Sequence, residues 1–245
     1  MDRVVPQLDV LHSPRLANGW LRRLYAASIV AVVPLVVLHL IGLSASVDST
    51  TALPVLLGLL LGLLCADLVT GVVHWACDSW GDEQTPWLGP GLIRAFREHH
   101  REPREMLEHD WIEVNGEVAA AALVALVLLS VAPIHGFVAG APLLYALMLG
   151  LIIGVGCANQ LHQWAHANHP PAVVRLLQTL GVVLTPRRHD RHHRASHARA
   201  YCISTGWSNT VLDALGFWRG LEAIVSRLTG AIPRVRRPRA AVRRP

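Results

Sequence analysis

The 245-residue chain is 52% hydrophobic and only 16% charged, whereas ordinary soluble domains have roughly 25% charged residues. This balance excludes a disordered chain and an ordinary soluble globule, and it is typical of a protein with several membrane spans. The net charge of +5 arises from 22 arginines, with no lysine, against 17 acidic residues. In a membrane protein this excess indicates topology and contact with anionic lipid headgroups rather than with nucleic acid.

Four long apolar stretches predict membrane-spanning helices, at about residues 24–43, 53–73, 118–138 and 142–157. Each is close to the roughly 20 residues that a helix needs to cross a bilayer. The first stretch ends in small residues spaced like a signal-peptidase site, but it is longer than the roughly 7–15 apolar residues of a signal peptide. We therefore predict an all-α membrane protein with four transmembrane helices, of which the first is retained.

The distribution of arginine predicts the orientation of these spans. Arginines gather in the N-terminal arm, between the second and third spans, and after the fourth span. The connections between spans 1 and 2 and between spans 3 and 4 are short and carry one charge, Asp48. By the positive-inside rule, both termini and the middle segment lie in the cytoplasm of a multi-pass integral membrane protein.

The chain changes character after the fourth span. Residues 158–210 are rich in His, Arg, Asn and Ser, and residues 211–229 have the pattern of an amphipathic helix. Its expected apolar face consists of Leu212, Leu215, Trp218, Leu221 and Ile224. Such a helix lies in the headgroup plane or caps the His-rich region. We predict an N-terminal cytosolic arm (1–23), a membrane domain (24–230) and a disordered Arg/Pro-rich tail (231–245).

Histidine is the unusual residue, with fourteen copies, and it is the commonest metal ligand in proteins. Ten of the fourteen fall in the two segments assigned to the cytoplasmic face. Structural roles are expected for the other four, His12, His39, His135 and His169. Clustering on one side of a membrane predicts a shared site.

The first group of polar residues lies at the cytoplasmic end of the second span. Asp67, Gly71, His74 and Asp78 follow a spacing of 4, 3 and 4 residues, which places them on one helical face. His74 and Asp78 can both reach one metal ion, or Asp78 can orient His74 through its second nitrogen. A plain hydrogen bond at a helix end is the alternative.

Three further groups follow along the chain. His99, His100 and His109 lie in residues 96–110. The adjacent pair points in directions about 100° apart on a helix, which suits two metals, or one metal and a contact to one of its ligands; a solvated charged face is the alternative. His162 and His166 are spaced four apart, as in helical metal sites. An HxxHH motif with one more histidine beyond it supplies the rest: His189, His192, His193 and His197.

Together these groups could supply the ligands of two metal ions. No cysteine box competes, which disfavours structural zinc and iron–sulfur sites. Imidazole ligands suit iron, copper, zinc and nickel alike. A metal pair walled by apolar helices is placed to attack a lipid chain, and an unactivated C–H bond needs an oxygen-derived oxidant, which iron supplies and zinc does not.

The motifs HWACDSWG, RAFREHHREPREMLEHDWIEVNG, NQLHQWAH and HDRHHRASHARAYCISTGWSN resemble the membrane lipid desaturases of the plasmanylethanolamine desaturase group, which is related to plant plastid desaturases. The resemblance covers about residues 55–230. It implies four spans and a cytosol-facing di-iron site bound by histidine. It also implies O₂-dependent removal of two hydrogens beside the ether oxygen of a plasmanyl ethanolamine phospholipid, which gives the vinyl ether of a plasmalogen.

The resemblance carries over to individual positions. The implied ligands of the two non-haem irons are His74, His99, His100, His162, His166, His189, His192 and His193. The further functional positions are Asp78, His109 and His197. Because the chain has no flavin fingerprint, haem-binding box or cysteine cluster, we expect an external electron donor that is cytochrome b5-like or ferredoxin-like, with O₂ as co-substrate and a membrane phospholipid as substrate.

Other functions stay open at this stage. Within the same class, the chain could be an acyl-lipid fatty acid desaturase or a hydroxylase. A metal transporter is a different class, but the polar groups lie at one membrane face and provide no relay across the bilayer. A zinc protease is disfavoured because the chain has no HExxH motif.

Overall fold

The computed structural model describes residues 19–131, 141–194 and 197–234, and this part of the chain forms helices and no strand. Four long apolar helices dominate it: α1 (Gly19–Ala45), α2 (Ala52–Ser79), α4 (Trp111–Val131) and α6 (Pro142–Gly156). Shorter helices carry most of the polar motifs: η1 (a π-helix, Gly89–Ile93), α3 (Arg94–Arg101), η2 (a 3₁₀-helix, Glu105–Leu107), α7 (Ala158–His166), α8 (Ala172–Thr179), α9 (Pro186–His193), α10 (Trp207–Ala214) and α11 (Phe217–Thr229).

The predicted all-α membrane fold is confirmed, with two changes at the spans. Helices α1, α2 and α4 are long and apolar enough to cross a membrane, whereas α6 and α7 are bent by 43° and make a fourth span only as a pair. Helix α4 begins at Trp111, seven residues before the predicted start. The prediction missed these residues because the first two turns of the helix are polar and the apolar stretch begins only after them. The predicted end of this span, and the positions of His12 and His135, lie outside the described residues.

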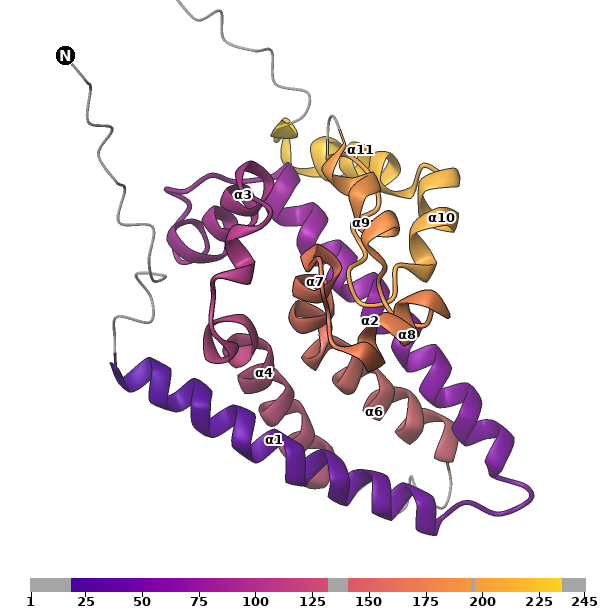
Figure 1. The fold of residues 1–245 in the computed structure, drawn as a ribbon. Helices are drawn as coiled ribbons and strands as arrows, with labels where there is room; N and C mark the ends of the chain where they lie inside the picture. Colours follow the sequence, from indigo (N-terminus) through magenta and orange to yellow (C-terminus); the bar gives the residue numbers. More distant parts are fainter. Residues whose placement is uncertain (1–18, 132–140, 195–196, 235–245) are drawn as a thin grey trace, which may run out of the picture.

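The long helices pack as two pairs joined side by side. Helix α2 lies along α6, α1 lies along α4, and α4 also contacts α6. Helices α3, α9 and α11 gather around the C-terminal end of α2, away from the connection between α1 and α2 (Figure 1). His39 bridges three helices, because its ring nitrogens contact the Tyr145 hydroxyl and the Leu126 carbonyl. This is the structural role expected for His39.

Small residues let α2 and α6 approach closely. A Cβ added to Gly62 would collide with the carbonyl of Leu147 and lie 2.7 Å from the nitrogen of Leu151, and one added to Gly150 would lie 2.7 Å from the carbonyl oxygen of Leu59. Stripes of small residues are a common means of helix association in membranes, where close packing replaces the hydrophobic effect. This contact fixes α2, and hence the polar residues at its end, against α6, which leads into α7.

Gly62→Ala is therefore expected to destabilise the protein by about 1–3 kcal/mol, because the methyl group meets backbone atoms that cannot rotate away. The matched control is Gly42→Ala in α1, where an added Cβ meets nothing within 4 Å and helix propensity gains about 1 kcal/mol. Thermal unfolding in detergent measures both. Equal melting temperatures for the two variants would contradict the close-packing role of Gly62.

The C-terminal region corrects the prediction of one amphipathic helix over 211–229. The chain breaks at Gly216, which has a left-handed φ of 63° and separates α10 from α11. Trp218 is buried against Trp75, Tyr201 and Cys202, but the predicted face partners Leu215 and Ile224 are 75% and 53% exposed. Helix α11 thus caps the His-rich region, and the glycine break rotates Leu215 away from the buried face.

Candidate metal centre

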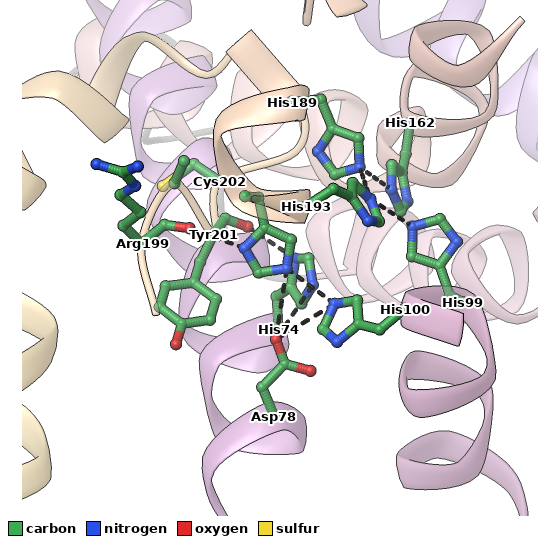
Figure 2. Close-up of polar contacts among 12 residues, drawn as sticks. His74, Asp78, His99, His100, His162, His189, His193, Arg199, Tyr201 and Cys202 are labelled. Carbon is green, nitrogen blue, oxygen red and sulfur yellow. Dashed lines mark hydrogen bonds and ion pairs between the residues drawn. The ribbon is translucent and has the colours of Figure 1, made fainter. Parts of the chain in front are cut away.

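The structure brings all eight predicted histidine ligands and Asp78 into two adjoining groups (Figure 2). We call the first the five-histidine group; it consists of His99, His162, His166, His189 and His193. We call the second the carboxylate group; it consists of His74, Asp78, His100 and His192. Within each group, one candidate ligand atom from every residue lies within 4.8 Å of all the others.

Helices α3 and α9 each contribute to both groups. In α9 the side chain of Thr185 caps the first turn by accepting a hydrogen bond from the Arg188 amide, and Pro186 follows it. His189 and His193 then enter the five-histidine group, while His192 enters the carboxylate group. The HxxHH motif therefore divides between the two groups instead of facing one ion.

Adjacent histidines in α3 divide in the same way, with His99 in one group and His100 in the other. Arg97, whose role the sequence reading missed, holds this helix in place. Its guanidinium is buried and donates hydrogen bonds to the carbonyl oxygens of Trp80 (3.3 Å) and Gly81 (2.7 Å), just after α2. The available sequence signal was an arginine two residues before a His pair, but the surrounding charged residues suggested a solvated face.

The inner histidines are removed from solvent. His74 and His192 have no exposed surface and His189 has 1%. The ring of Phe96 lies 4.9 Å from that of His74, and the ring of Tyr201 lies 5.1 Å from that of His192, measured between centroids. Imidazoles in such surroundings stay neutral and present bare nitrogens, the form that binds metal ions.

Hydrogen bonds fix which nitrogen faces inward in the carboxylate group. The Nδ1 atoms of His74 and His192 lie 3.0 and 2.8 Å from the carbonyl oxygens of Tyr201 and Arg199. A carbonyl only accepts, so each Nδ1 carries the proton and each Nε2 keeps its lone pair. Both Nε2 atoms lie 3.5 Å from the Oδ2 atom of Asp78, and that of His192 also lies 2.9 Å from the Nε2 atom of His100. These atoms are all possible metal ligands, and they converge where one cation could bind them.

In the five-histidine group, too, the ring nitrogens are close together and cannot all be satisfied by hydrogen bonds to one another. Four close contacts link its Nε2 atoms in a chain from His166 through His162, His189 and His193 to His99, at 3.3, 2.7, 2.9 and 3.1 Å. A neutral ring nitrogen has either one hydrogen or one lone pair, so at most two of these four contacts can be well-formed hydrogen bonds. Ligand atoms about 2.1 Å from one first-row ion lie about 3 to 3.5 Å apart. The residues of both groups therefore fit metal ions.

A comparison with known protein families decides the class of protein. Residues 63–236 match the family described as the lipid desaturase domain. The chain belongs to the lipid desaturase family. This confirms the family predicted from the histidine motifs.

Relatives of this lipid desaturase carry related names. It is 36% identical over 222 residues to the plasmanylethanolamine desaturase of Myxococcus xanthus, covering 89% of this chain and 78% of that protein. It is 40% identical over 189 residues to plasmanylethanolamine desaturase 1 of Mus musculus, covering 74% and 68%. Similarity extends to the chloroplastic fatty acid desaturase 4 of Arabidopsis thaliana, at 34% over 178 residues, covering 71% and 52%. No solved structure matches the chain.

Two predicted functional histidines of the lipid desaturase lie outside both groups. His197 stacks on His100, with ring centroids 4.3 Å apart and planes inclined by 8°, so it borders the carboxylate group. His109 is farther along the chain from α3, and its Nε2 lies 4.0 Å from a carboxylate oxygen of Glu105. The structure therefore places His197 beside the site and gives His109 a partner outside it.

Burial and the neighbouring imidazoles oppose protonation of the site. Burial first, and then nearby histidines, lowers the pKa of His100 to about 2 and that of His193 to about 4. Burial also lowers the pKa of His192 to about 3, against the opposing effect of its hydrogen bond to the Arg199 carbonyl. In the unfolded chain each imidazole has a pKa of about 6.5.

The stability of the metal-free lipid desaturase is therefore expected to fall steeply with acidification between about pH 6.5 and pH 4. In this window the unfolded chain binds more protons than the folded chain, so the free energy of unfolding rises with pH, by up to about 1.4 kcal/mol per pH unit for each buried imidazole. Denaturant unfolding in detergent from pH 4 to 8 measures the slope, and His193→Gln should reduce it. Constant stability across this range would contradict the neutral-imidazole site.

Proposed function

We propose that this lipid desaturase converts a 1-O-alkyl (plasmanyl) ethanolamine phospholipid into its 1-O-alk-1′-enyl form, using O₂ and two histidine-bound irons. The observation that carries the proposal is the pair of buried metal-binding groups where α2 and α7 end. The relatives in Myxococcus xanthus and Mus musculus, both named plasmanylethanolamine desaturases, support the choice of substrate.

In this proposal the five-histidine group holds one iron and the carboxylate group holds the other. Bound iron supplies the redox chemistry with O₂ that the side chains lack. The substrate loses two hydrogens as two protons and two electrons, and an external donor supplies two more electrons. With two further protons from the medium, O₂ takes up four electrons and four protons in all and becomes two waters. The chain's own residues hold the ions, keep eight imidazoles neutral and exclude water through the burial of His74, His189 and His192.

The depth of the site favours an ether lipid. The carbons beside the ether oxygen lie just below the headgroup, level with the end of a membrane span. His74 and Asp78 occupy the last two turns of α2, so a site there reaches these first carbons without a deep tunnel. Arg187 and Arg194 lie at the two ends of α9 with exposed side chains, where they can bind the phosphate and fix the register of the alkyl chain.

We infer that the metal centre faces the cytoplasm, as the arginine distribution requires. Cysteine placed at Ser49, in the exposed connection between α1 and α2, should react with an impermeant thiol reagent added outside intact cells. Cysteine placed at Ala95, exposed in α3, should react only after the membrane is opened. Outside labelling at Ala95 would contradict this orientation.

The proposed reaction is tested in a host that lacks plasmalogens and is fed an alkylglycerol. Expression of the chain should yield acid-labile vinyl ethers by mass spectrometry, and the His189→Ala chain should not. Unchanged alkyl lipid, with oxygen, a competent reductase and folded iron-loaded protein present, would overturn the ether reaction.

A second candidate is desaturation of an acyl chain, favoured by the 34% identity to the chloroplastic fatty acid desaturase 4. The same cells distinguish it, because a new double bond would then appear in a fatty acyl chain while the alkyl ether stays saturated. A hydroxylated chain in place of a double bond would identify a hydroxylase.

A further inference from the structure

The segment from Arg199 to Gly206, which we call the strap, runs between α9 and α10 beside the carboxylate group. Two of its carbonyl oxygens face this group: that of Arg199 accepts from Nδ1 of His192, and that of Tyr201 accepts from Nδ1 of His74 (Figure 2). The strap thus fixes the ring orientation and the tautomer of two candidate ligands.

Side chains outside the strap hold its first half. The amide of Ala200 donates to Oδ1 of Asp213 (3.1 Å), and the amide of Cys202 donates to Oδ1 of Asn209 (2.9 Å), whose own amide donates back to the Cys202 carbonyl (2.9 Å). Ala200 lies between the two functional carbonyls and has a φ of 57°. A left-handed alanine costs of order 1 kcal/mol and persists where surrounding contacts enforce it.

Asp67, buried in α2, holds the second half. Its Oδ1 accepts from the amides of Thr205 and Gly206, both at 2.9 Å, and its Oδ2 accepts from the amide of Ser208 at 3.0 Å. One carboxylate therefore secures the end of the strap and caps the start of α10. Asp67 touches no candidate metal ligand through these bonds, so it acts on the site through the strap.

The five-histidine group has no matching support. The buried Nδ1 atoms of His99, His189 and His193 have no hydrogen-bond partner among the residues that the structure describes. All five of its members are neutral imidazoles, whereas the other group includes the Asp78 carboxylate. In a buried setting of low dielectric, a negative ligand attracts a divalent ion far more strongly than it does in water.

We propose that the two groups bind metal unequally, and that the strap and Asp78 make the carboxylate group the tight site, which is filled first and emptied last. The inference rests on the proposed function in taking both groups to hold metal ions. Fixed rings lose less freedom on binding, and a hydrogen bond from Nδ1 to a carbonyl makes Nε2 a stronger ligand. Asp67 is then a positioning residue for a metal that it does not contact.

The test loads the purified full-length chain with Fe²⁺ under anaerobic conditions and challenges it with graded chelator, with iron per chain measured by elemental analysis. The wild-type chain should lose iron in two equal steps separated by at least about tenfold in chelator concentration. His99→Ala should remove the labile step and leave the resistant one. These measurements do not depend on which lipid is the substrate.

Asp67→Asn should move the resistant step to about tenfold lower chelator or beyond, the usual cost of losing outer-shell support, and leave the labile step in place. The matched control is Asp48→Asn, since Asp48 also accepts from backbone amides, those of Thr50 and Thr51, but in the connection between α1 and α2. It should leave both steps unchanged. If Asp67→Asn does not fold, Asp213→Ala removes the anchor of Ala200 instead and should produce the same shift.

A single step of iron loss in the wild-type chain would overturn the inference. So would strap variants whose steps occur at the same chelator concentrations as those of the Asp48→Asn control. Neither result would contradict the proposed reaction. A folded wild-type chain that binds no iron in either step would overturn the proposed metal function and this inference with it. Lipid products and iron retention therefore separate the two failures.

Discussion

Replacing His189 with alanine is expected to lower lipid desaturation by at least about 100-fold, since even outer-shell losses at metal sites cost about 10- to 100-fold. His189 is 1% exposed, and its Nε2 lies 2.7 Å from that of His162 and 2.9 Å from that of His193. It is the middle member of the chain of Nε2 contacts that links the five-histidine group. Desaturation per folded chain, with iron content measured on the same sample, tests the effect.

The matched control for this variant is His169→Ala. His169 lies in the exposed turn between α7 and α8, so its loss should leave both activity and iron content near the wild-type values. His39→Ala is a poor control because His39 bridges α1, α4 and α6. Wild-type activity in the His189→Ala chain would contradict a ligand role for the five-histidine group.

The fold class was readable from the sequence because long apolar runs have few alternatives to helices in a membrane. Spacing also indicated which helices carry the candidate ligands, since histidines four residues apart share a helical face. The angle between the adjacent residues His99 and His100 correctly suggested two directions. These inferences depend only on local geometry, because the spacing of two residues along a helix sets the angle between their side chains.

The division of HxxHH between two groups could not be predicted in the same way. Spacing puts His189, His192 and His193 on one side of α9, but the packing of α9 between α2 and α7 decides which of them meets which partner. The strap is a similar case, because Asp67 and Thr205 are 138 residues apart. A buried Asp in a span signals a partner, yet nothing in the sequence says that the partner is a set of backbone amides.

Asp78→Asn is expected to separate metal binding from folding. The Oδ2 of Asp78 lies 3.5 Å from the Nε2 atoms of His74 and His192, and neither its carboxyl oxygens nor the Nε2 of His74 has a hydrogen-bond partner among the described residues. An asparagine amide of the same shape can donate a hydrogen to one of these nitrogens. The metal-free variant should therefore melt at the wild-type temperature or above it.

The same substitution removes the only negative charge of the carboxylate group, so iron should fall from about two to about one per chain and desaturation by at least about 100-fold. The remaining iron should leave in the labile chelator step, because it is held by the five-histidine group. Asp190→Asn, on the exposed side of α9 next to His189, is the control and should change neither iron content nor activity. If Asp78 had only a structural role, its loss would lower the melting temperature of the metal-free chain while iron bound to the folded fraction stayed at two. A melting temperature that does not fall, together with less iron, is the result that a metal-binding carboxylate predicts, because Asp78 then serves to hold the ion and not to hold the fold.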